Sequence, residues 1–313
     1  MKNASFSNKQ LLPTNLAKAR ALELPSRAAM LNRTSSALEF WEQHNRLLAN
    51  AWREWETTEN IRLNNIDDIL MDPKIRSAVE QSWDDPSNEN KVKEMWEEVS
   101  PGVFQCQFFD PEHLATLRQY LENCASAAIP MRPPYGIALN RFGAMLDERS
   151  EGFLAAPSFQ SFYRNLHDRY MRPIARLLFP EIIGFDTQTF GFSIQYQPDM
   201  DTSLRLHSDA SAATLNVNLN LPDETYLGSE VDFYDPISGK ANRLTFKPGV
   251  AMLHRGSVAH AAQPITGGKR TNFVLWLYGD RMQLPSRSET GQLITPNERW
   301  SKPSENKDKF APF

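Results

Sequence analysis

The second half of the chain reads as a series of short strands, and this pattern limits the possible fold more than any other feature. From about residue 188 onward, alternating runs rich in β-branched and aromatic residues are separated by turn sequences such as PDET, DPISGK and ITGGK. The runs are FGFSIQY, LRLHSD, TLNVNLN, SEVDFYD, RLTF, VAMLH, VAHAAQ and TNFVLWLY. Eight short strands with no helix between them predict an all-β jelly roll or barrel.

The preceding part of the chain has mostly helical patterns. In residues 35–56, leucines and tryptophans recur at spacings of three, four and seven, which predicts an amphipathic helix with Ser35 or Ser36 as its N-cap. Residues 102–110 alternate like a strand. Further helices are predicted at 64–83, interrupted at Pro73, at 110–127, and at 157–179 with a kink before Pro173.

Charge and composition argue against several classes of function. The formal net charge of the 313 residues is −4 and the basic residues are scattered, so we expect no nucleic-acid partner. No apolar run approaches the ~18 residues needed to span a bilayer, and the N-terminus lacks the apolar segment of a secretory signal. The two cysteines, Cys106 and Cys124, are too few for a disulfide scaffold or a cysteine-based zinc site. A cytoplasmic location is therefore expected.

Three residues in the strand region form a candidate metal site. His207 and Asp209 are two apart on one predicted strand, so their side chains project from the same face. A third ligand, His260, would come from a strand far along the chain, lying across the barrel. Two imidazoles and one carboxylate suit Fe(II) and leave three coordination positions open.

Arg270 is a candidate anion-binding residue near this site. It follows His260 by ten residues and begins the last, mostly apolar strand after the turn ITGG. A guanidinium can hold a carboxylate through two parallel hydrogen bonds. Arg270 is therefore a natural anchor for an acid that also binds the metal.

Together these residues resemble the iron(II)- and 2-oxoglutarate-dependent oxygenases, and most closely the prolyl and lysyl hydroxylase branch. The resemblance covers roughly residues 188–280. Two positions depart from the branch: Ser229 stands where a second glycine is usual, and Asn218 where several relatives have a tyrosine. The matching residues are His207-Ser208-Asp209, GSEVDF from Gly228 to Phe233, Pro248-Gly249, His260, and GGKR ending at Arg270.

The resemblance implies an α+β fold with a double-stranded β-helix (jelly roll, cupin-like) core and flanking N-terminal helices. The helical, strand and Pro/Ser-rich patterns of the chain itself predict that residues 1–99 are a helical region that packs on the core or acts as its lid, residues 100–285 the catalytic domain, and residues 286–313 an arm or tail. The implied cofactors are Fe(II), 2-oxoglutarate as cosubstrate and O₂, with ascorbate as an optional reductant.

The resemblance also assigns roles to individual residues. His207, Asp209 and His260 would be the catalytic metal ligands, and Arg270 would bind the far carboxylate of 2-oxoglutarate. His254 competes with His260 as third ligand, but the spacing to Arg270 favours His260, which leaves His254 a structural role. Tyr196 would hydrogen-bond the cosubstrate, with an ordinary core tyrosine as the alternative.

A row of asparagines follows Asp209 in the strand TLNVNLN. Thr214, Asn216, Asn218 and Asn220 share one face, and the leucines and valine share the other, which would pack outward against helices or a second sheet layer. Asparagine offers hydrogen-bond donors and acceptors without charge. Asn218, and after it Asn216, is therefore expected to contact 2-oxoglutarate or substrate. The alternative is a solvent-facing edge strand.

The substrate is the least constrained part of the prediction. We expect oxidation of an unactivated C–H bond, by hydroxylation, desaturation or oxidative cyclisation, in a small, amino-acid-derived molecule. Arg205, two residues before His207, would share the cavity face and bind an acidic group, and Asn140 and Arg141 are further substrate candidates. Asp209 argues against a halogenase, because relatives that halogenate have a small residue at that position.

Other functions stay open beside this one. The closest branch would instead give a prolyl or lysyl hydroxylase acting on a peptide or protein. A cupin-like metal protein without 2-oxoglutarate and an inactive barrel used for binding are further alternatives. A Ser-His-Asp hydrolase is disfavoured, because Ser208 points to the opposite strand face from His207 and Asp209.

Overall fold

Antiparallel sheets form the centre of the molecule. The computed structural model describes residues 13–63, 66–134, 143–181, 189–277 and 294–302. Within them, one sheet has the order β1-β2-β9-β5-β12-β3, a second β4-β10-β7-β8, and β11 pairs with β6. The strands are β1 (Glu97–Ser100), β2 (Val103–Gln107), β3 (Thr189–Tyr196), β4 (Leu204–His207), β5 (Ala213–Asn218), β6 (Leu227–Gly228), β7 (Val231–Tyr234), β8 (Ala241–Leu244), β9 (Val250–Arg255), β10 (His260–Ala262), β11 (Ile265–Gly267) and β12 (Arg270–Leu277).

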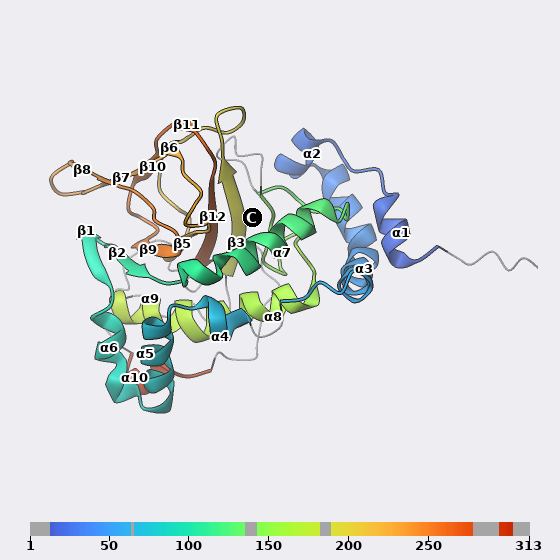
Figure 1. The fold of residues 1–313 in the computed structure, drawn as a ribbon. Coiled ribbons are helices and arrows are strands. Elements are labelled where there is room, and N and C mark those ends of the chain that lie inside the picture. The colour runs from blue at the N-terminus through green and yellow to red at the C-terminus, as the bar shows by residue number, and fades with distance from the viewer. Residues whose placement is uncertain (1–12, 64–65, 135–142, 182–188, 278–293, 303–313) are drawn as a thin grey trace, which may run out of the picture.

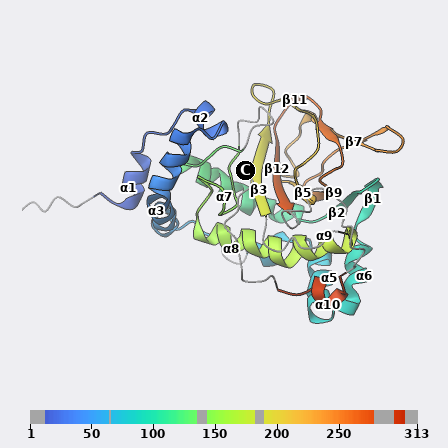
Figure 2. The ribbon, with the colours of Figure 1, turned by 180° about the vertical axis from the view of Figure 1, so that it is seen from behind.

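Helices cover one face of the six-stranded sheet and lie beyond its ends (Figure 1). Seen from both sides, α8 and α9 run along the sheet, α1 to α3 lie at one end, and α5, α6 and α10 lie at the other (Figure 2). The helices are α1 (Asn15–Arg20), α2 (Arg27–Leu31), α3 (Ser35–Thr58), α4 (Ile66–Leu70), α5 (Pro73–Asp84), α6 (Glu89–Lys93), α7 (Leu114–Ser126), α8 (Pro157–Asn165), α9 (Arg172–Leu178) and α10 (Pro296–Arg299).

Two hydrophobic clusters explain this layering. The larger one joins the helices to one face of the six-stranded sheet, where Leu215 and Val217 of β5, and Leu219 just after it, pack with Phe273 and Leu275 of β12. The aromatic rings of α8 close this contact, for example Phe159 against Phe273 with centroids 6.3 Å apart. The leucine face of the TLNVNLN strand therefore packs against helices, as predicted.

The second cluster joins the two larger sheets to each other. Phe190 and Trp276 of the six-stranded sheet pack in the same cluster as Val231 and Phe233 of the four-stranded sheet. The sheets therefore face one another, and the inner face of each lines the space between them. The predicted α+β class, with antiparallel sheets and flanking helices, is confirmed.

Local signals in the sequence set most element boundaries. All eight predicted strands of the second half are present, and β6 and β11 are two short additions. The cap of α3 is Thr34, one residue before the predicted Ser35. The helices predicted around Pro73 are α4 and α5, and the break between them falls just before Pro73, which begins α5 with Asp72 as its N-cap. Before Pro173 the chain forms a π-helical segment, Leu166–Met171, which accounts for the predicted irregularity.

Among the described residues, no helix combines the length and apolar character that crossing a bilayer requires.

Candidate metal centre

His207, Asp209 and His260 come together as predicted. His207 ends β4, Asp209 follows it, and His260 begins β10. One ligand atom from each lies within 4.8 Å of the others. The expectation that His260 lies across the barrel was wrong: β10 pairs directly with β4, and His260 stands opposite His207 in that ladder. Neighbouring strands thus supply both imidazoles.

Backbone carbonyl groups orient both imidazole rings. Nδ1 of His207 lies 2.8 Å from the carbonyl oxygen of Arg205, and Nδ1 of His260 lies 3.0 Å from that of Val258. Because a carbonyl oxygen only accepts, each Nδ1 carries the proton and donates it. The Nε2 atoms, which carry no proton when the rings are neutral, then face Asp209 Oδ1, at 3.4 Å from His207 and 3.8 Å from His260. This tautomer is the one that a metal ligand needs.

Asp209 is a buried carboxylate whose two oxygens have different partners. Oδ2 accepts a 2.6 Å hydrogen bond from the Thr214 hydroxyl, while Oδ1 faces His207 and His260. Burial alone would raise the pKa of this carboxyl, but His260, His207 and Thr214 outweigh it and hold the pKa well below its usual range. Asp209 is therefore ionised, with one oxygen directed toward the two histidines.

Removing the Thr214 hydroxyl should weaken metal binding without abolishing it. In Thr214→Val, Asp209 loses the hydrogen bond that fixes its orientation, and outer partners of this kind contribute about 10–100-fold to metal affinity. Titration with Co(II), followed by its absorption bands, measures the change. Thr214→Ser, which keeps the hydroxyl, is the matched control. Equal affinities in the valine and serine variants would contradict this role.

His254 lies beside the cluster rather than in it. It belongs to β9 and is 1% exposed, and its ring centroid is 4.8 Å from that of His260. Its Nδ1 is 2.9 Å from the carbonyl oxygen of Arg255, and its Nε2 is 3.8 Å from Oδ2 of Asp209. That oxygen is the one engaged by Thr214, so His254 approaches Asp209 on the side away from the two candidate ligands.

The three histidines differ in proton affinity. Burial lowers the pKa of His260 to about 4, and it also lowers the pKa of His254. Burial acts in the same direction on His207, but the hydrogen bond and charge of Asp209 outweigh it and raise the pKa. At neutral pH, His260 is therefore ready to bind a metal, whereas His207 keeps its second proton to a higher pH than an ordinary histidine does.

This difference predicts how metal affinity depends on pH. A bound metal must displace the proton of His207, so affinity should fall by about tenfold per pH unit once the pH drops below the raised pKa of His207. Above that pKa the affinity should be constant. Co(II) titrations between pH 8 and pH 5 measure the slope. If metal binding displaced two protons rather than one in this pH range, the assignment of His260 as already neutral would be contradicted.

Arg270 lines the same small cavity as the metal cluster. The cavity has a volume of about 50 Å³, and its polar wall includes Tyr196, Thr214, Asn216 and Asn272. Arg270 is 2% exposed and donates a 2.5 Å hydrogen bond to the carbonyl oxygen of Ser229. Its guanidinium lies 4.6 Å from the ring centroid of Tyr196 and 5.5 Å from that of Phe246.

The guanidinium of Arg270 has no carboxylate partner among the described residues. Burial lowers its pKa, while Tyr196, Tyr226 and Glu230 oppose that effect. A buried cation without an opposite charge is costly, so the site favours an anionic ligand. The Ser229 backbone has φ +62°, a conformation that glycine adopts more readily. This explains why a glycine would suit the position, although the serine carbonyl still reaches Arg270.

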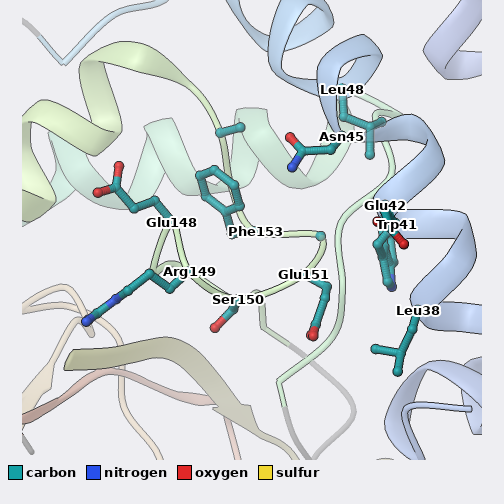
Figure 3. Close-up of a pocket in the computed structure, with 12 residues that line it drawn as sticks. Leu38, Trp41, Glu42, Asn45, Leu48, Glu148, Arg149, Ser150, Glu151 and Phe153 are labelled. Carbon is teal, nitrogen blue, oxygen red and sulfur yellow. The ribbon is translucent and has the colours of Figure 1, made fainter. Parts of the chain in front are cut away.

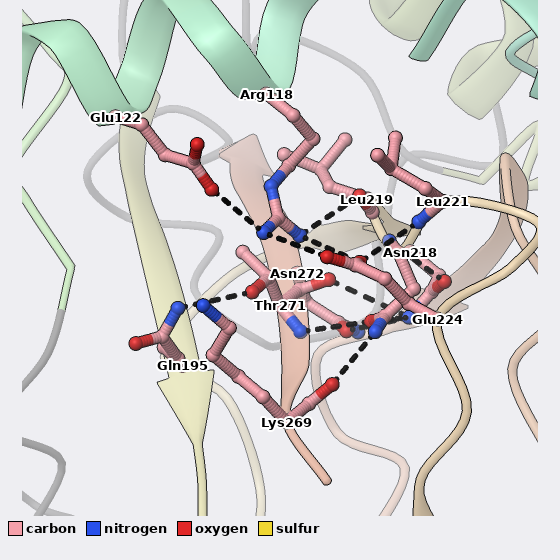
Figure 4. A network of polar contacts seen from close by, with 11 residues as sticks. Arg118, Glu122, Gln195, Asn218, Leu219, Leu221, Glu224, Lys269, Thr271 and Asn272 are labelled. Carbon is pink, nitrogen blue, oxygen red and sulfur yellow. Dashed lines mark hydrogen bonds and ion pairs between the residues drawn. The ribbon is translucent and has the colours of Figure 1, made fainter. Parts of the chain in front are cut away.

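The asparagine row divides into two parts, which corrects one prediction. Asn216 lines the cavity and accepts a hydrogen bond from Asn272. Asn218 is fully buried, does not line the cavity, and uses its amide to bind Asn220, Asn272 and the Thr271 carbonyl (Figure 4). A direct contact of Asn218 with cosubstrate is therefore not supported. The edge-strand alternative was also wrong, because β5 lies between β9 and β12.

The substrate candidates are only partly placed. Arg205 is exposed and is absent from the cavity wall, so its predicted place beside His207 is not supported. Asn140 and Arg141 lie outside the described residues. Tyr196 lines the cavity and stands opposite Arg270 in the ladder of β3 and β12, and its bond to the cosubstrate stays a prediction.

Several cavity residues were missed in the sequence, among them two with polar groups. Asn272 and Trp276 lie on β12, where positions 270, 272, 274 and 276 all line the cavity. Alternation counted from Arg270 would have identified them. A larger cavity of about 560 Å³ lies elsewhere, between α3 and residues 148–155, and includes Trp41 and Phe153 (Figure 3). None of its lining residues belongs to the metal cluster.

Comparisons with known proteins agree with this picture. A family model described as an OGFOD2-like domain matches residues 58–184. This region lies before residues 188–280, to which the resemblance seen in the sequence was confined. The chain is 31% identical over 195 residues to the 2-oxoglutarate and iron-dependent oxygenase domain-containing protein ICU11 of Arabidopsis thaliana, a match covering 57% of this chain and 46% of that protein. The 2-oxoglutarate and iron-dependent oxygenase domain-containing protein 2 of Xenopus tropicalis is 30% identical over 182 residues, a match covering 56% of this chain and 48% of that protein.

More distant similarities include named hydroxylases. The chain is 35% identical over 108 residues to the human multifunctional procollagen lysine hydroxylase and glycosyltransferase LH3. This match covers 32% of this chain and 14% of that protein. A crystal structure of a Pseudomonas putida prolyl-4-hydroxylase aligns at 15% identity and a TM-score of 0.40, covering 57% of this chain and 93% of that one. The chain spans about half the length of the first two relatives. The predicted relationship to these oxygenases is confirmed.

Proposed function

We propose that this relative of the 2-oxoglutarate and iron-dependent oxygenases is itself an Fe(II)- and 2-oxoglutarate-dependent oxygenase. The observation that carries the proposal is one cavity shared by the His207, Asp209 and His260 cluster and a buried arginine without a carboxylate partner among the described residues. The cluster of two histidines and one aspartate suits Fe(II). The buried arginine suits the far carboxylate of a dicarboxylic cosubstrate.

Each residue has a distinct task in this proposal. His207 and His260 would bind the metal through Nε2, because their Nδ1 atoms are held by backbone carbonyls. Asp209 would bind through Oδ1, with Oδ2 held by Thr214. Arg270 would hold the cosubstrate carboxylate, with the Tyr196 ring against its guanidinium. When bound, Fe(II) with O₂ would couple the conversion of 2-oxoglutarate to succinate and CO₂ to oxidation of a substrate C–H bond.

The arrangement of the sheets supports a double-stranded β-helix as the detailed fold. The six-stranded and four-stranded antiparallel sheets pack face to face, and the metal cluster and Arg270 lie between them. Metal ligands from the smaller sheet and the anion-binding arginine from the larger one then meet at one cavity. This is the placement expected of a ligand site in the mouth of a closed β structure.

The size of the cavity favours a peptide or protein substrate over the small molecule expected from the sequence. Sites that enclose small molecules usually have volumes of about 300–1,000 Å³, whereas the described residues enclose about 50 Å³ here. The metal ligand His207 lies on the outermost strand of the four-stranded sheet, and its side chain is 16% exposed. A polypeptide needs to present only one side chain at such a mouth. One relative is named for lysine hydroxylation in procollagen.

The test combines turnover with substrate discovery. The purified chain, with Fe(II), 2-oxoglutarate and ascorbate, should release succinate, and omission of iron should abolish release. Tryptic peptides of a treated cell lysate should gain the mass of one oxygen atom, while a metabolite extract of the same cells should be unchanged. Oxidised metabolites without modified peptides would overturn the peptide proposal. Absence of succinate release under all conditions would overturn the oxygenase proposal.

A further inference from the structure

We infer that Asn220 is a positioning residue that holds the backbone on both sides of Arg270. This inference rests on the proposed function, because it concerns how the candidate 2-oxoglutarate anchor is aimed. Asn220 is buried just beyond the end of β5. Its Nδ2 donates a 2.7 Å hydrogen bond to the carbonyl oxygen of Lys269, and its Oδ1 accepts a 3.0 Å hydrogen bond from the backbone N–H of Thr271.

Asn220 acts where the strand ladder has already ended. The β5–β12 pairing stops at Asn218 and Asn272, so Arg270 lies beyond it. On its other side, Arg270 is still paired with Tyr196 of β3. One amide side chain therefore takes the place of the missing strand. Without it, the N–H of Thr271 and the C=O of Lys269 would both lose a hydrogen-bond partner on that side.

The amide of Asn220 is itself held in one orientation. Its Oδ1 also accepts from Nδ2 of Asn218, and its backbone N–H donates to Oδ1 of Asn218. Since Oδ1 has two donors and Nδ2 faces a carbonyl oxygen, a flipped amide would place like groups together. The contacts of Asn220 thus fit a single rotamer.

The same network reaches helix α7 through Arg118. This buried residue donates to the carbonyl oxygen of Leu219 and pairs with Glu224 and Glu122 (Figure 4). The N–H of Leu219 in turn donates to the carbonyl oxygen of Thr271. The segment 218–224 is therefore fixed between α7 and the start of β12. The backbone at Arg270 is thus set by regular pairing with β3 on one side and by these hydrogen bonds on the other.

The test separates cosubstrate binding from metal binding. In Asn220→Ala, the dissociation constant for 2-oxoglutarate, measured calorimetrically on the Mn(II) form, should rise roughly tenfold, because two hydrogen bonds that fix the Arg270 backbone are lost. The dissociation constant for Mn(II) should stay within about twofold of the unaltered chain. Hydrogen exchange of the Thr271 amide should accelerate.

A second variant and a matched control keep the result interpretable. Asn220→Asp retains an acceptor for Thr271 but not the donor for Lys269, so it should weaken 2-oxoglutarate binding while preserving Thr271 protection. Gln160→Ala removes another buried amide that bridges two backbone groups, the carbonyls of Leu146 and Leu154, and should leave 2-oxoglutarate binding unchanged.

The outcomes distinguish this inference from the proposed function. If the unaltered Mn(II) form does not bind 2-oxoglutarate, the proposed function fails and the inference falls with it. If it binds and both Asn220 variants bind equally well, the inference alone is overturned. A parallel loss of Mn(II) and 2-oxoglutarate binding in Asn220→Ala would also overturn it, because that result indicates general disruption.

Discussion

The His260→Ala variant should lose nearly all affinity for Fe(II), whereas His254→Ala should retain it. His260 directs Nε2 toward the same oxygen of Asp209 as His207 does, and His254 lies against the opposite oxygen. Loss of one of three ligands should weaken binding by on the order of 100-fold or more, since even outer partners contribute about 10–100-fold. Anaerobic titration with Fe(II), or with Co(II) as a spectroscopic substitute, measures both variants.

His254→Ala is a stringent control for this experiment. It removes an imidazole that is more deeply buried than that of His260 and lines the same cavity, so general damage to the site should be at least as large in this variant. His254 lies against Oδ2 of Asp209 and the ring of His260 but directs no atom toward the shared Oδ1, so its loss should cost about tenfold at most. If the His260→Ala variant bound the metal more tightly than the His254→Ala variant, the assignment would be reversed and His254 would be the third ligand.

Two members of the metal cluster were predictable because their signal is local. His207 and Asp209 are two apart in the sequence, and alternation along a predicted strand put them on one face, although β4 ends at His207 and Asp209 lies just beyond it. What the sequence did not reveal was the order of strands within a sheet. Pairing of β10 with β4 depends on long-range packing, so His260 was expected across the barrel, although it stands opposite His207.

The asparagine row shows how far alternation can be used. Alternation predicted the inward face of β5 correctly, and Thr214 and Asn216 do line the cavity. It does not say where along a strand the cavity ends. Asn218 lies past that end and serves to join strands, so the same residue type has a binding position at one site and a structural role two residues later.

The prediction that Arg205 lies in the cavity was wrong for a different reason. Its spacing of two from His207 predicted a shared face, but the β4–β10 ladder changes register between His260 and Ala262. An irregularity of this kind breaks simple alternation over a strand of four residues. No residue type in LRLHSD marks the irregularity, so the exposed position of Arg205 could not be read from the sequence.

Arg270→Met should weaken 2-oxoglutarate binding by on the order of 100-fold, because hydrogen bonds to charged groups contribute about 1.5–3 kcal/mol each and a two-pronged contact is lost. Calorimetry on the Mn(II) form measures this effect, and the affinity for Mn(II) itself should be unchanged. Arg270→Lys keeps the charge but not the fork-shaped donor, so its affinity should be intermediate. Undiminished 2-oxoglutarate binding in Arg270→Met would favour a cupin-like metal protein that does not use this cosubstrate.

The thermal stability of the Arg270→Met variant tests whether the buried guanidinium serves ligand binding at a cost to the stability of the fold. In the absence of ligand, the fold buries a guanidinium that has no carboxylate partner among the described residues, which is costly, and methionine of similar length removes that cost. Arg270→Met should therefore unfold at an equal or higher temperature than the unaltered chain, even though it binds 2-oxoglutarate poorly. Adding 2-oxoglutarate and Mn(II) should then stabilise only the unaltered chain. A variant that loses both stability and binding would instead indicate that Arg270 mainly holds Ser229 in place.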